Sequence, residues 1–245
     1  MSRNIRLEIE YDGTNYCGWQ VQDSGKSIQA TIEKALKKIL REKVSLIVSG
    51  RTDAGVHAEA QVANFKTGSS IPLNKLQLAL NTFLPKDIVV SKVKEVPVDF
   101  HSRFSAKSKI YRYMVLNRSY SSAFLRNRSH LFSFPLNLRL MRQEAKCLLG
   151  RHNFKAFQAA DKTERNPFKT IKRIRIDKDG DLIEFQLEAD GFLYNMARNI
   201  VGTLLEIGRG RFTKGDLIRI LRSKDRGLAG PTAPARGLCL VKVKY

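Results

Sequence analysis

The sequence contains few residues that could form disulfides or bind metal ions. Its 245 residues include three cysteines, Cys17, Cys147 and Cys239, which are odd in number and far apart. This arrangement is neither a disulfide framework nor a zinc site. None of the four histidines makes a close ligand pair with another histidine or a cysteine, which argues against a structural metal. We therefore expect a reduced, cytoplasmic protein.

Long apolar runs are absent as well. The longest apolar stretches fall well short of the roughly 18 residues that a membrane-spanning helix needs. Residues 1–6 lead directly into an alternating pattern, so no secretory signal is expected. Hydrophobic residues still make up 42% of the chain, as in an ordinary globular protein. The length suggests one large domain or two small ones.

Acidic residues are scarce relative to basic ones. The chain has 44 Lys and Arg against 23 Asp and Glu, a formal net charge of +21. Residues 1–103 carry a net charge of +4 and residues 104–245 carry +17, so the second half is expected to hold most of a phosphate-binding surface. Such an excess indicates an anionic partner, most commonly a nucleic acid. The alternative is that the basic surplus serves solubility, but solubility does not require this much charge of one sign.

Periodicity predicts a mixed α and β chain whose two halves repeat one order of elements. In the first half the pattern indicates strands at 5–11, 44–49, 62–67 and 88–96, a loop at 50–60, a helix from Ile28 to Leu40 capped by Ser27, and a helix from Pro72 to Phe83. In the second half it indicates strands at 109–116, 171–177, 182–190 and 238–243, a helix capped by Asn137, and helices at 195–207 and 213–222.

Each half therefore reads β-α-β-β-α-β, which is the order of a ferredoxin-like, split β-α-β unit. The predicted fold class is α+β, with two ferredoxin-like domains that have antiparallel sheets. The expected domains are residues 1–103 and the strongly basic residues 104–245. A cleft between two such domains is a natural place for a folded nucleic acid.

The densest group of candidate functional residues is the segment 49–57, Ser-Gly-Arg-Thr-Asp-Ala-Gly-Val-His. Asp53 has small neighbours, so a ligand could approach its carboxylate closely. Arg51 lies two residues away, and the glycines on either side permit unusual backbone angles. On composition alone, an Asx-turn in which Asp53 merely shapes the loop is the favoured interpretation.

Several blocks of sequence, taken in order, resemble the tRNA pseudouridine synthase A (TruA) family. The Gly50–His57 motif is similar to that family's signature. The other matching blocks are Tyr11–Thr14 with Gly18–Gln20, Asn81–Asp87, Phe100–Ala106, Tyr111–Tyr113, Gly191–Gly202, Thr232–Pro234 and Gly237–Leu240. Ala197 stands where the family pattern suggests valine, and Ile110 where it suggests a charged residue. The resemblance covers nearly the whole chain.

The resemblance implies a fold and a function. It implies the pseudouridine synthase fold, with the active site in a cleft between the two domains. It implies conversion of uridine to pseudouridine at positions 38, 39 and 40 of the tRNA anticodon stem-loop. It also implies a cytoplasmic homodimer that uses no metal and no cofactor.

The resemblance also assigns roles to three residues. Asp53 is the catalytic residue, either as a nucleophile that forms a covalent intermediate or as a base that allows elimination. Arg198 pairs with Asp53 and holds it ionised. Tyr111 stacks on the flipped uracil. For Arg51, its place beside Asp53 favours binding of a phosphate or of the target nucleotide's backbone.

Each assignment has a plainer alternative in the residues themselves. Arg198 could be a solvated helix charge, and Arg51 could pair within its own loop. Tyr111 and Tyr113 lie on one face of a strand, so both could face the core. His57 and His101 are expected to be structural hydrogen-bonding residues, because the proposed chemistry does not require histidine.

Two other function classes fit some of these residues. His57-Ala58-Glu59 fits half of the nucleobase deaminase signature, but no two cysteines are close enough to form the Pro-Cys-x-x-Cys half. A non-catalytic tandem RNA-binding module would suit the charge. However, the aromatic RNA-recognition strand motif is not evident, and such a module would have no obvious purpose for the Asp53 loop.

Overall fold

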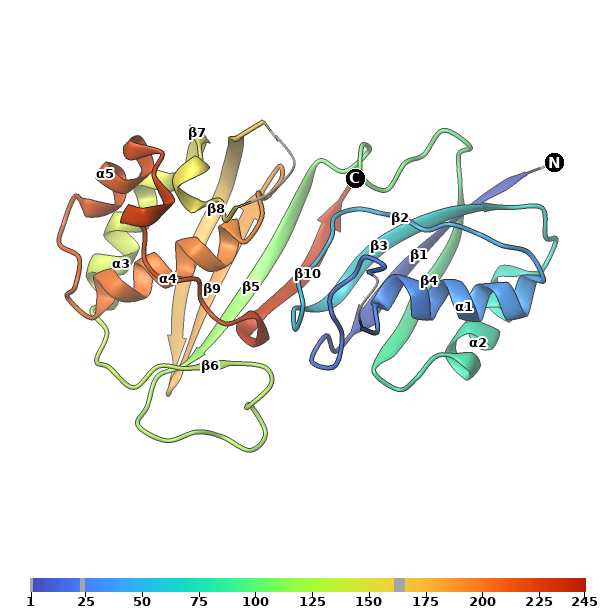
Figure 1. The fold of residues 1–245 in the computed structure, drawn as a ribbon, viewed down its shortest axis with the longest axis horizontal. Helices are drawn as coiled ribbons and strands as arrows, with labels where there is room; N and C mark the ends of the chain where they lie inside the picture. The colour runs from blue at the N-terminus through green and yellow to red at the C-terminus, as the bar shows by residue number, and fades with distance from the viewer. Residues whose placement is uncertain (1, 23–24, 161–165) are drawn as a thin grey trace. The chain divides into compact units, whose positions relative to one another are not determined.

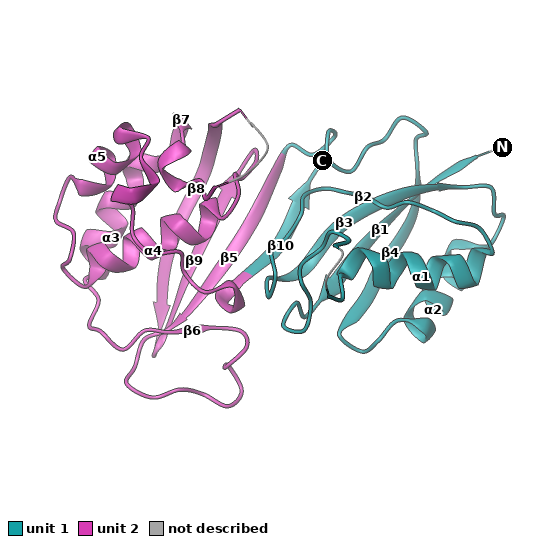
Figure 2. Ribbon diagram, in the orientation of Figure 1, with its two compact units in different colours: residues 1–107, 239–245 teal, residues 108–238 magenta. Residues whose placement is uncertain are grey.

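The computed structural model describes residues 2–22, 25–160 and 166–245. Its helices and strands form two compact units (Figure 2). Unit 1 comprises residues 1–107 and 239–245, and unit 2 comprises residues 108–238. Within the described ranges, no helix combines the length and apolar character needed to cross a membrane.

Unit 1 is a sheet covered by two helices. Its strands are ordered β4-β1-β3-β10, and β2 also pairs with β3. The strands are β1 (Arg3–Tyr11), β2 (Ile47–Val48), β3 (His57–Thr67), β4 (Ile88–Val96) and β10 (Leu238–Lys244); the helices are α1 (Ile28–Leu40) and α2 (Leu73–Phe83). β1 runs antiparallel to both β3 and β4, whereas β10 runs parallel to β3. Figure 1 shows both helices on one face of this sheet.

Helix α1 forms where capping and periodicity agree. The Ser27 hydroxyl accepts a hydrogen bond from the Ala30 backbone N at 3.2 Å, which satisfies an otherwise unpaired donor of the first turn. Ile28, Ile32 and Leu36 recur at helical spacing and are fully buried. The prediction of this helix from its capping serine and apolar stripe is confirmed.

Unit 2 has a second sheet with its own helices. Its strands are ordered β5-β9-β8-β7, and β6 pairs with β5. The strands are β5 (Ser108–Leu116), β6 (His130–Leu131), β7 (Gly150–Asn153), β8 (Phe168–Asp179) and β9 (Leu182–Ala189). The helices are α3 (Leu138–Ala145), α4 (Met196–Gly208) and α5 (Asp216–Ser223), with short 3-10 helices η1 (Lys146–Leu148), η2 (Lys155–Phe157), η3 (Arg226–Leu228) and η4 (Ala235–Gly237).

Two expected features of the Asp53 region differ in the structure. The third strand begins at His57 rather than Val62, so the loop expected at 50–60 ends earlier. Gln61 is fully buried and His57 nearly so, and polar residues at buried positions concealed the start of this strand from apolar alternation. The second strand covers only Ile47–Val48 rather than 44–49. The short strands β6 and β7 were not predicted.

The two compact units divide the chain differently from the expected domains 1–103 and 104–245. Unit 1 continues to residue 107 and also takes the last strand. That strand pairs with β3 through Cys239 opposite His57 and Leu240 opposite Ala58. Local periodicity correctly predicts a strand there but carries no information about a partner this distant in sequence.

Replacing Ser27 with alanine is expected to lower the free energy of unfolding by about 0.5–2 kcal/mol, because the Ala30 N–H loses its cap. Urea denaturation followed by circular dichroism measures this change. Ser45→Ala, at an exposed position, is the control and should stay within about 0.5 kcal/mol of the parent. Equal stabilities for the two variants would contradict the capping role.

Candidate active site

Asp53 lies half-buried in the loop between β2 and β3 of unit 1. The backbone on either side of it is fixed by hydrogen bonds. The Thr52 carbonyl accepts from the Trp19 backbone N at 3.0 Å, and the Asp53 carbonyl accepts from the Val56 backbone N at 3.1 Å. The loop is therefore held by its main chain, and the Asp53 side chain is presented from a supported position.

Two glycines let the segment 12–19 pack directly against this loop. A Cβ on Gly18 would lie 2.7 Å from the Thr52 carbonyl oxygen, and Gly18 has a φ of +106°, which L side chains rarely adopt. A Cβ on Gly13 would overlap the carbonyl oxygen of Val56. The contact therefore joins the N-terminal sequence block to the Asp53 motif through close backbone packing.

Buried polar side chains support the start of the loop. Gln61 donates to the Gly50 carbonyl at 2.9 Å and accepts from the Ser49 hydroxyl at 2.7 Å. The Tyr11 hydroxyl lies 2.8 Å from the Thr52 hydroxyl. Burial raises the pKa of Tyr11 well above its ordinary value, so its phenol keeps its proton at neutral pH. Gln61 received no role from the sequence; its only signal was a polar residue next to an apolar strand.

His57 and His101 hold loop backbone, as expected. The His57 Nδ1 accepts from the Gly13 backbone N at 3.1 Å. The His101 Nδ1 accepts from the backbone N of Arg103 and of Phe104, at 3.2 and 3.3 Å. In the described parts of the chain, no three His, Cys, Asp or Glu side chains are grouped so that they could hold a metal ion.

Arg51 is exposed on the same loop, two residues before Asp53. Its guanidinium forms no hydrogen bond or ion pair with any other residue of the loop 50–56, all of which the structure describes. The alternative that Arg51 pairs within its own loop is therefore not what the structure has. The side chain presents its charge outward.

In unit 2, Arg198 is the single residue of α4 that is not buried. Its Nε donates to the Ala233 carbonyl at 2.7 Å, and a terminal nitrogen donates to the Asn195 side-chain oxygen at 2.8 Å. A solvated helix charge would lack such anchors, so that alternative is wrong. The guanidinium is instead fixed between the start of α4 and the segment that precedes η4.

Tyr111 and Tyr113 share the buried face of β5, as the strand pattern predicted. Tyr111 is 7% exposed, and its ring meets the Phe192 ring edge-on with centroids 4.9 Å apart. Tyr113 is fully buried and donates to the Pro234 carbonyl at 2.8 Å. Burial raises the pKa of Tyr113, and the positive charges of Arg198 and Arg236 oppose part of that rise.

The late helix and the C-terminal block also meet through a glycine. A Cβ on Gly202 of α4 would overlap the Pro231 carbonyl oxygen. Beside this contact the Asn199 side-chain oxygen accepts from the Thr232 hydroxyl at 2.6 Å and from Arg226 at 3.0 Å. These contacts fix the segment that carries Ala233, the acceptor for Arg198.

Gly202→Ala is expected to lower the free energy of unfolding by about 1–3 kcal/mol, because the added methyl group has no space beside Pro231. Gly68→Ala is the matched control, since a Cβ at Gly68 meets nothing within 4 Å. Urea denaturation of both variants measures the difference. A Gly202 variant as stable as the Gly68 variant would contradict the close packing.

Comparison with known proteins finds relatives that match this chain along its length. A family model described as tRNA pseudouridine synthase matches residues 8–105 and 145–245. A tRNA pseudouridine synthase A from Thermoanaerobacter sp. (strain X514) is 47% identical over 243 residues, covering 99% of this chain and all of that protein. A tRNA pseudouridine synthase A 2 from Clostridium tetani is 49% identical over 247 residues, with full coverage of both chains.

One solved structure, of a Cbf5-Nop10-Gar1 complex, is 11% identical with a TM-score of 0.32, covering 97% of this chain and 58% of that one. So slight a likeness supports no conclusion about this chain. The family match and the full-length relatives are sufficient without it. The chain belongs to the tRNA pseudouridine synthase family.

Proposed function

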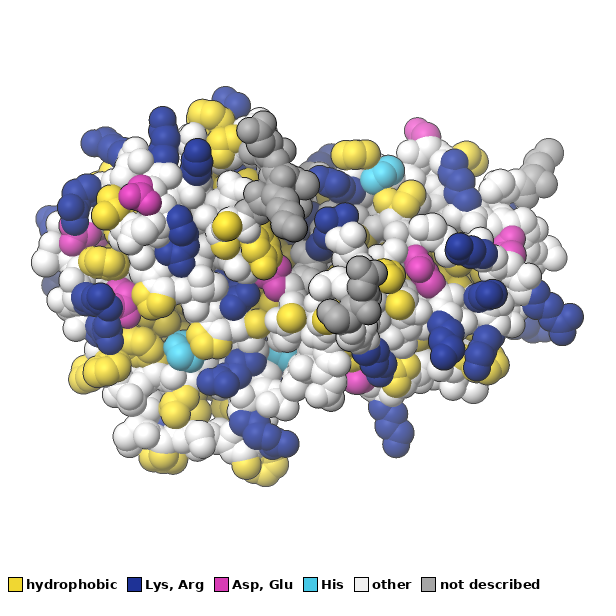
Figure 3. All heavy atoms as spheres, viewed as in Figure 1, with side chains coloured by type: hydrophobic (Ala, Val, Ile, Leu, Met, Phe, Trp, Pro, Cys, Tyr) yellow, Lys and Arg dark blue, Asp and Glu magenta, His cyan; other side chains and the backbone are white. Residues whose placement is uncertain are grey.

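We propose that this chain, an isomerase of tRNA uridine, forms pseudouridine at positions 38, 39 and 40 of the anticodon stem-loop. The observation that carries the proposal is the identity of 47% over 99% of the chain with a relative named tRNA pseudouridine synthase A. The net charge of +21 supports a polyanionic substrate. On the face in Figure 3, Lys and Arg side chains clearly outnumber Asp and Glu.

The proposed mechanism centres on the Asp53 carboxylate. The N1–C1′ glycosidic bond of uridine breaks, the uracil turns, and a C5–C1′ bond forms. C5 loses its hydrogen as a proton and N1 takes up a proton, so the product is an isomer of the substrate. Asp53 acts either as the nucleophile on carbon or as the base that permits elimination. Both routes need the carboxylate ionised in a site that excludes water. The fixed backbone around Asp53 supports this role because it limits the positions the carboxylate can take.

In this proposal Arg198 pairs with Asp53 and offsets the cost of keeping a partly desolvated carboxylate charged. The hydrogen bonds of Arg198 to Ala233 and Asn195 support the role, since they hold the guanidinium in one direction. A fixed cation stabilises a carboxylate without first losing side-chain freedom.

Tyr111 is proposed to stack on the extruded uracil, and Arg51 to bind the phosphate or backbone of the target nucleotide. Base–aromatic stacking contributes about 1–3 kcal/mol, which would offset part of the unstacking cost. The contact of Phe192 on Tyr111 supports a fixed ring. The exposure of Arg51 supports a contact with a large ligand.

The proposal extends to the architecture. Both compact units, residues 1–107 with 239–245 and residues 108–238, are ferredoxin-like domains of the pseudouridine synthase fold, with the active-site cleft between them. The order β1-α1-β2-β3-α2-β4 in unit 1 supports the first of these domains. The active form is a cytoplasmic homodimer that needs no metal or cofactor.

Asp53→Asn is expected to lower turnover by at least ~100-fold while leaving tRNA affinity within a few-fold, because the amide keeps the shape but cannot attack or accept a proton. A tRNA transcript with tritium at C5 of its uridines measures turnover as released tritium. Asp99→Asn, which removes the same charge at an exposed position, is the control.

Release by the parent and by Asp99→Asn alone supports both the reaction and the role of Asp53. Tight tRNA binding without any release by the parent would instead favour a non-catalytic RNA-binding module. A loss of affinity equal to the loss of rate would sink the assignment of Asp53.

Tyr111→Phe is expected to lose less tRNA affinity than Tyr111→Leu, because phenylalanine keeps the aromatic plane and leucine does not. The expected loss for leucine corresponds to about 1–3 kcal/mol of stacking. Filter binding at fixed salt measures both constants. Equal losses for the two variants would count against stacking.

A further inference from the structure

A basic surface loop of unit 2 has no role in the function proposed above. The chain leaves β5 at Leu116 and returns in β6, where His130 pairs with Val115. We call the intervening residues 117–129 the arginine-serine loop. It contains three arginines, four serines and no acidic residue: Arg118, Arg126, Arg128, Ser119, Ser121, Ser122 and Ser129. It also lies outside the two ranges that the family model matches, 8–105 and 145–245.

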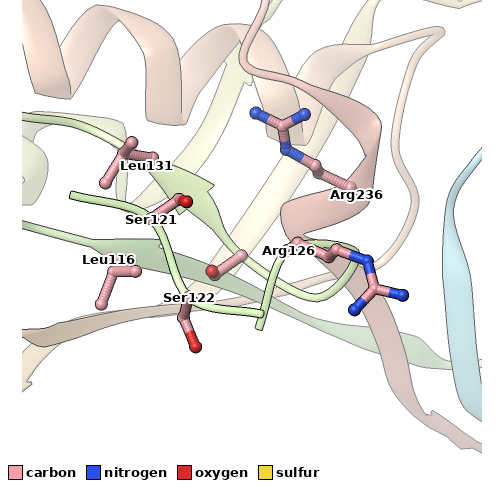
Figure 4. A pocket seen from close by; sticks show the side chains of 7 residues that line it. Leu116, Ser121, Ser122, Arg126, Leu131 and Arg236 are labelled. Atoms are coloured by element: carbon pink, nitrogen blue, oxygen red, sulfur yellow. The ribbon is translucent and has the colours of Figure 1, made fainter. Parts of the chain in front are cut away.

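The loop lines a pocket of about 160 Å³. This volume is several times the ~30 Å³ that a water molecule occupies in the liquid, so the pocket admits a group the size of a phosphate. The described residues that line it include no carboxylate; they are Leu116, Ser121, Ser122, Arg126, Ser129, Leu131 and Arg236. Figure 4 shows Arg126 from the loop and Arg236 from η4, with their guanidinium groups pointing in different directions.

The hydrogen bonds around the pocket leave it rich in donors. The Ser122 hydroxyl accepts from the Leu125 backbone N at 3.3 Å, so its own hydrogen points elsewhere. Ser129 instead donates to the Leu125 carbonyl at 3.0 Å, which fixes the fold of the loop. Arg126 is anchored to the Ala123 carbonyl through one terminal nitrogen of a guanidinium that carries five N–H donors.

The charge of Arg236 acts on the interior next to the pocket. Burial, and then the charge of Arg236, lower the pKa of His130 to about 4, so His130 is neutral at physiological pH. The two arginines therefore supply the positive charge of the described lining, and serine hydroxyls supply the remaining donors. Guanidinium groups and hydroxyls are donors that suit a phosphate oxyanion.

Two exposed aromatic side chains belong to the same loop. Phe124 is 95% exposed and lies two residues from both Ser122 and Arg126. Tyr120 is 64% exposed, with the Arg118 guanidinium 4.1 Å above its ring centroid. Exposed aromatic rings next to arginines are the arrangement on which unpaired bases stack.

We propose that the arginine-serine loop is a second RNA-binding site, in which the pocket holds one backbone phosphate and Phe124 stacks on a neighbouring base. The inference rests on the proposed function only in taking RNA as the partner. Neither Arg126 nor Phe124 has a part in the proposed reaction, so the site is expected to contribute affinity rather than chemistry.

The test compares Arg126→Ala, Phe124→Ala and the control Arg139→Ala, which removes an exposed arginine of α3. Affinity for an unmodified tRNA transcript is measured over a range of salt concentrations. Arg126→Ala is expected to weaken binding and to reduce the slope of log affinity against log salt by about 0.7–0.9, the value for one lost phosphate contact. Phe124→Ala is expected to weaken binding about 5-fold or more with the slope unchanged, because a stacked ring releases no counterions.

The outcomes separate cleanly. Parent-like affinity and slope in both loop variants would overturn the proposal, as would equal effects in Arg139→Ala. Titration of the parent with inorganic phosphate separates the sources of the anion. Phosphate binding that Arg126→Ala abolishes, with RNA affinity unchanged, would assign the pocket to free phosphate and overturn the RNA site.

Two further measurements serve as controls for the comparison of these variants. Unchanged urea midpoints establish that the loop variants fold. Tritium release at saturating tRNA should match the parent, because the loop does not take part in the reaction. A parent that binds RNA but releases no tritium would refute the proposed function, while the salt slopes would still decide the role of the loop.

Discussion

Backbone packed directly on backbone is the constraint on which the Asp53 region depends. Gly13 and Gly18 bring the segment 12–19 against the loop so closely that a Cβ at either position would strike a carbonyl of that loop. A carboxylate on a loop with freedom to move would spend most of its time out of position for reaction. Here the main chain is fixed by contacts that no side-chain rearrangement can relax, so the position of Asp53 follows from the fold of unit 1.

In unit 2 the corresponding constraint is different, because a cation lies in a helix that is otherwise buried. A guanidinium at such a position loses hydration, and the loss must be offset by hydrogen bonds. Arg198 obtains them from the Ala233 carbonyl and the Asn195 side chain. The contact of Gly202 with Pro231 keeps that carbonyl in place, so close backbone packing is again what fixes a charged side chain.

The sequence predicted most elements because most of them bury one face. α1, β4 and β9 follow their apolar periodicity nearly to the residue. The start of β3 was not predicted because its buried positions are polar: Gln61 is fully buried, and His57 is 7% exposed. Hydrogen bonds rather than apolar contacts stabilise these buried side chains. A search for alternating hydrophobic residues therefore does not detect this part of the strand.

The candidate site was less predictable than the fold. The residues alone drew attention to the Asp53 segment but favoured a turn role for Asp53, and Arg198 was one cation among 44, so the resemblance was needed to assign roles to both. The structure supplies a physical reason for part of that resemblance. The block 11–20 is packed on the Asp53 loop, and the blocks 191–202 and 232–234 are joined through Arg198, Asn199 and Thr232.

Rigidity and charge therefore have separate places in this chain. The fixed segments around Asp53 and Arg198 leave little freedom, which suits a reaction whose geometry must not change between substrates. The arginine-serine loop is bounded by strand pairing but carries exposed aromatic and basic side chains, among them Phe124 and Arg126. Phosphate contacts add affinity without sequence preference, so the role proposed for this loop does not require the fixed geometry that the segments around Asp53 and Arg198 have.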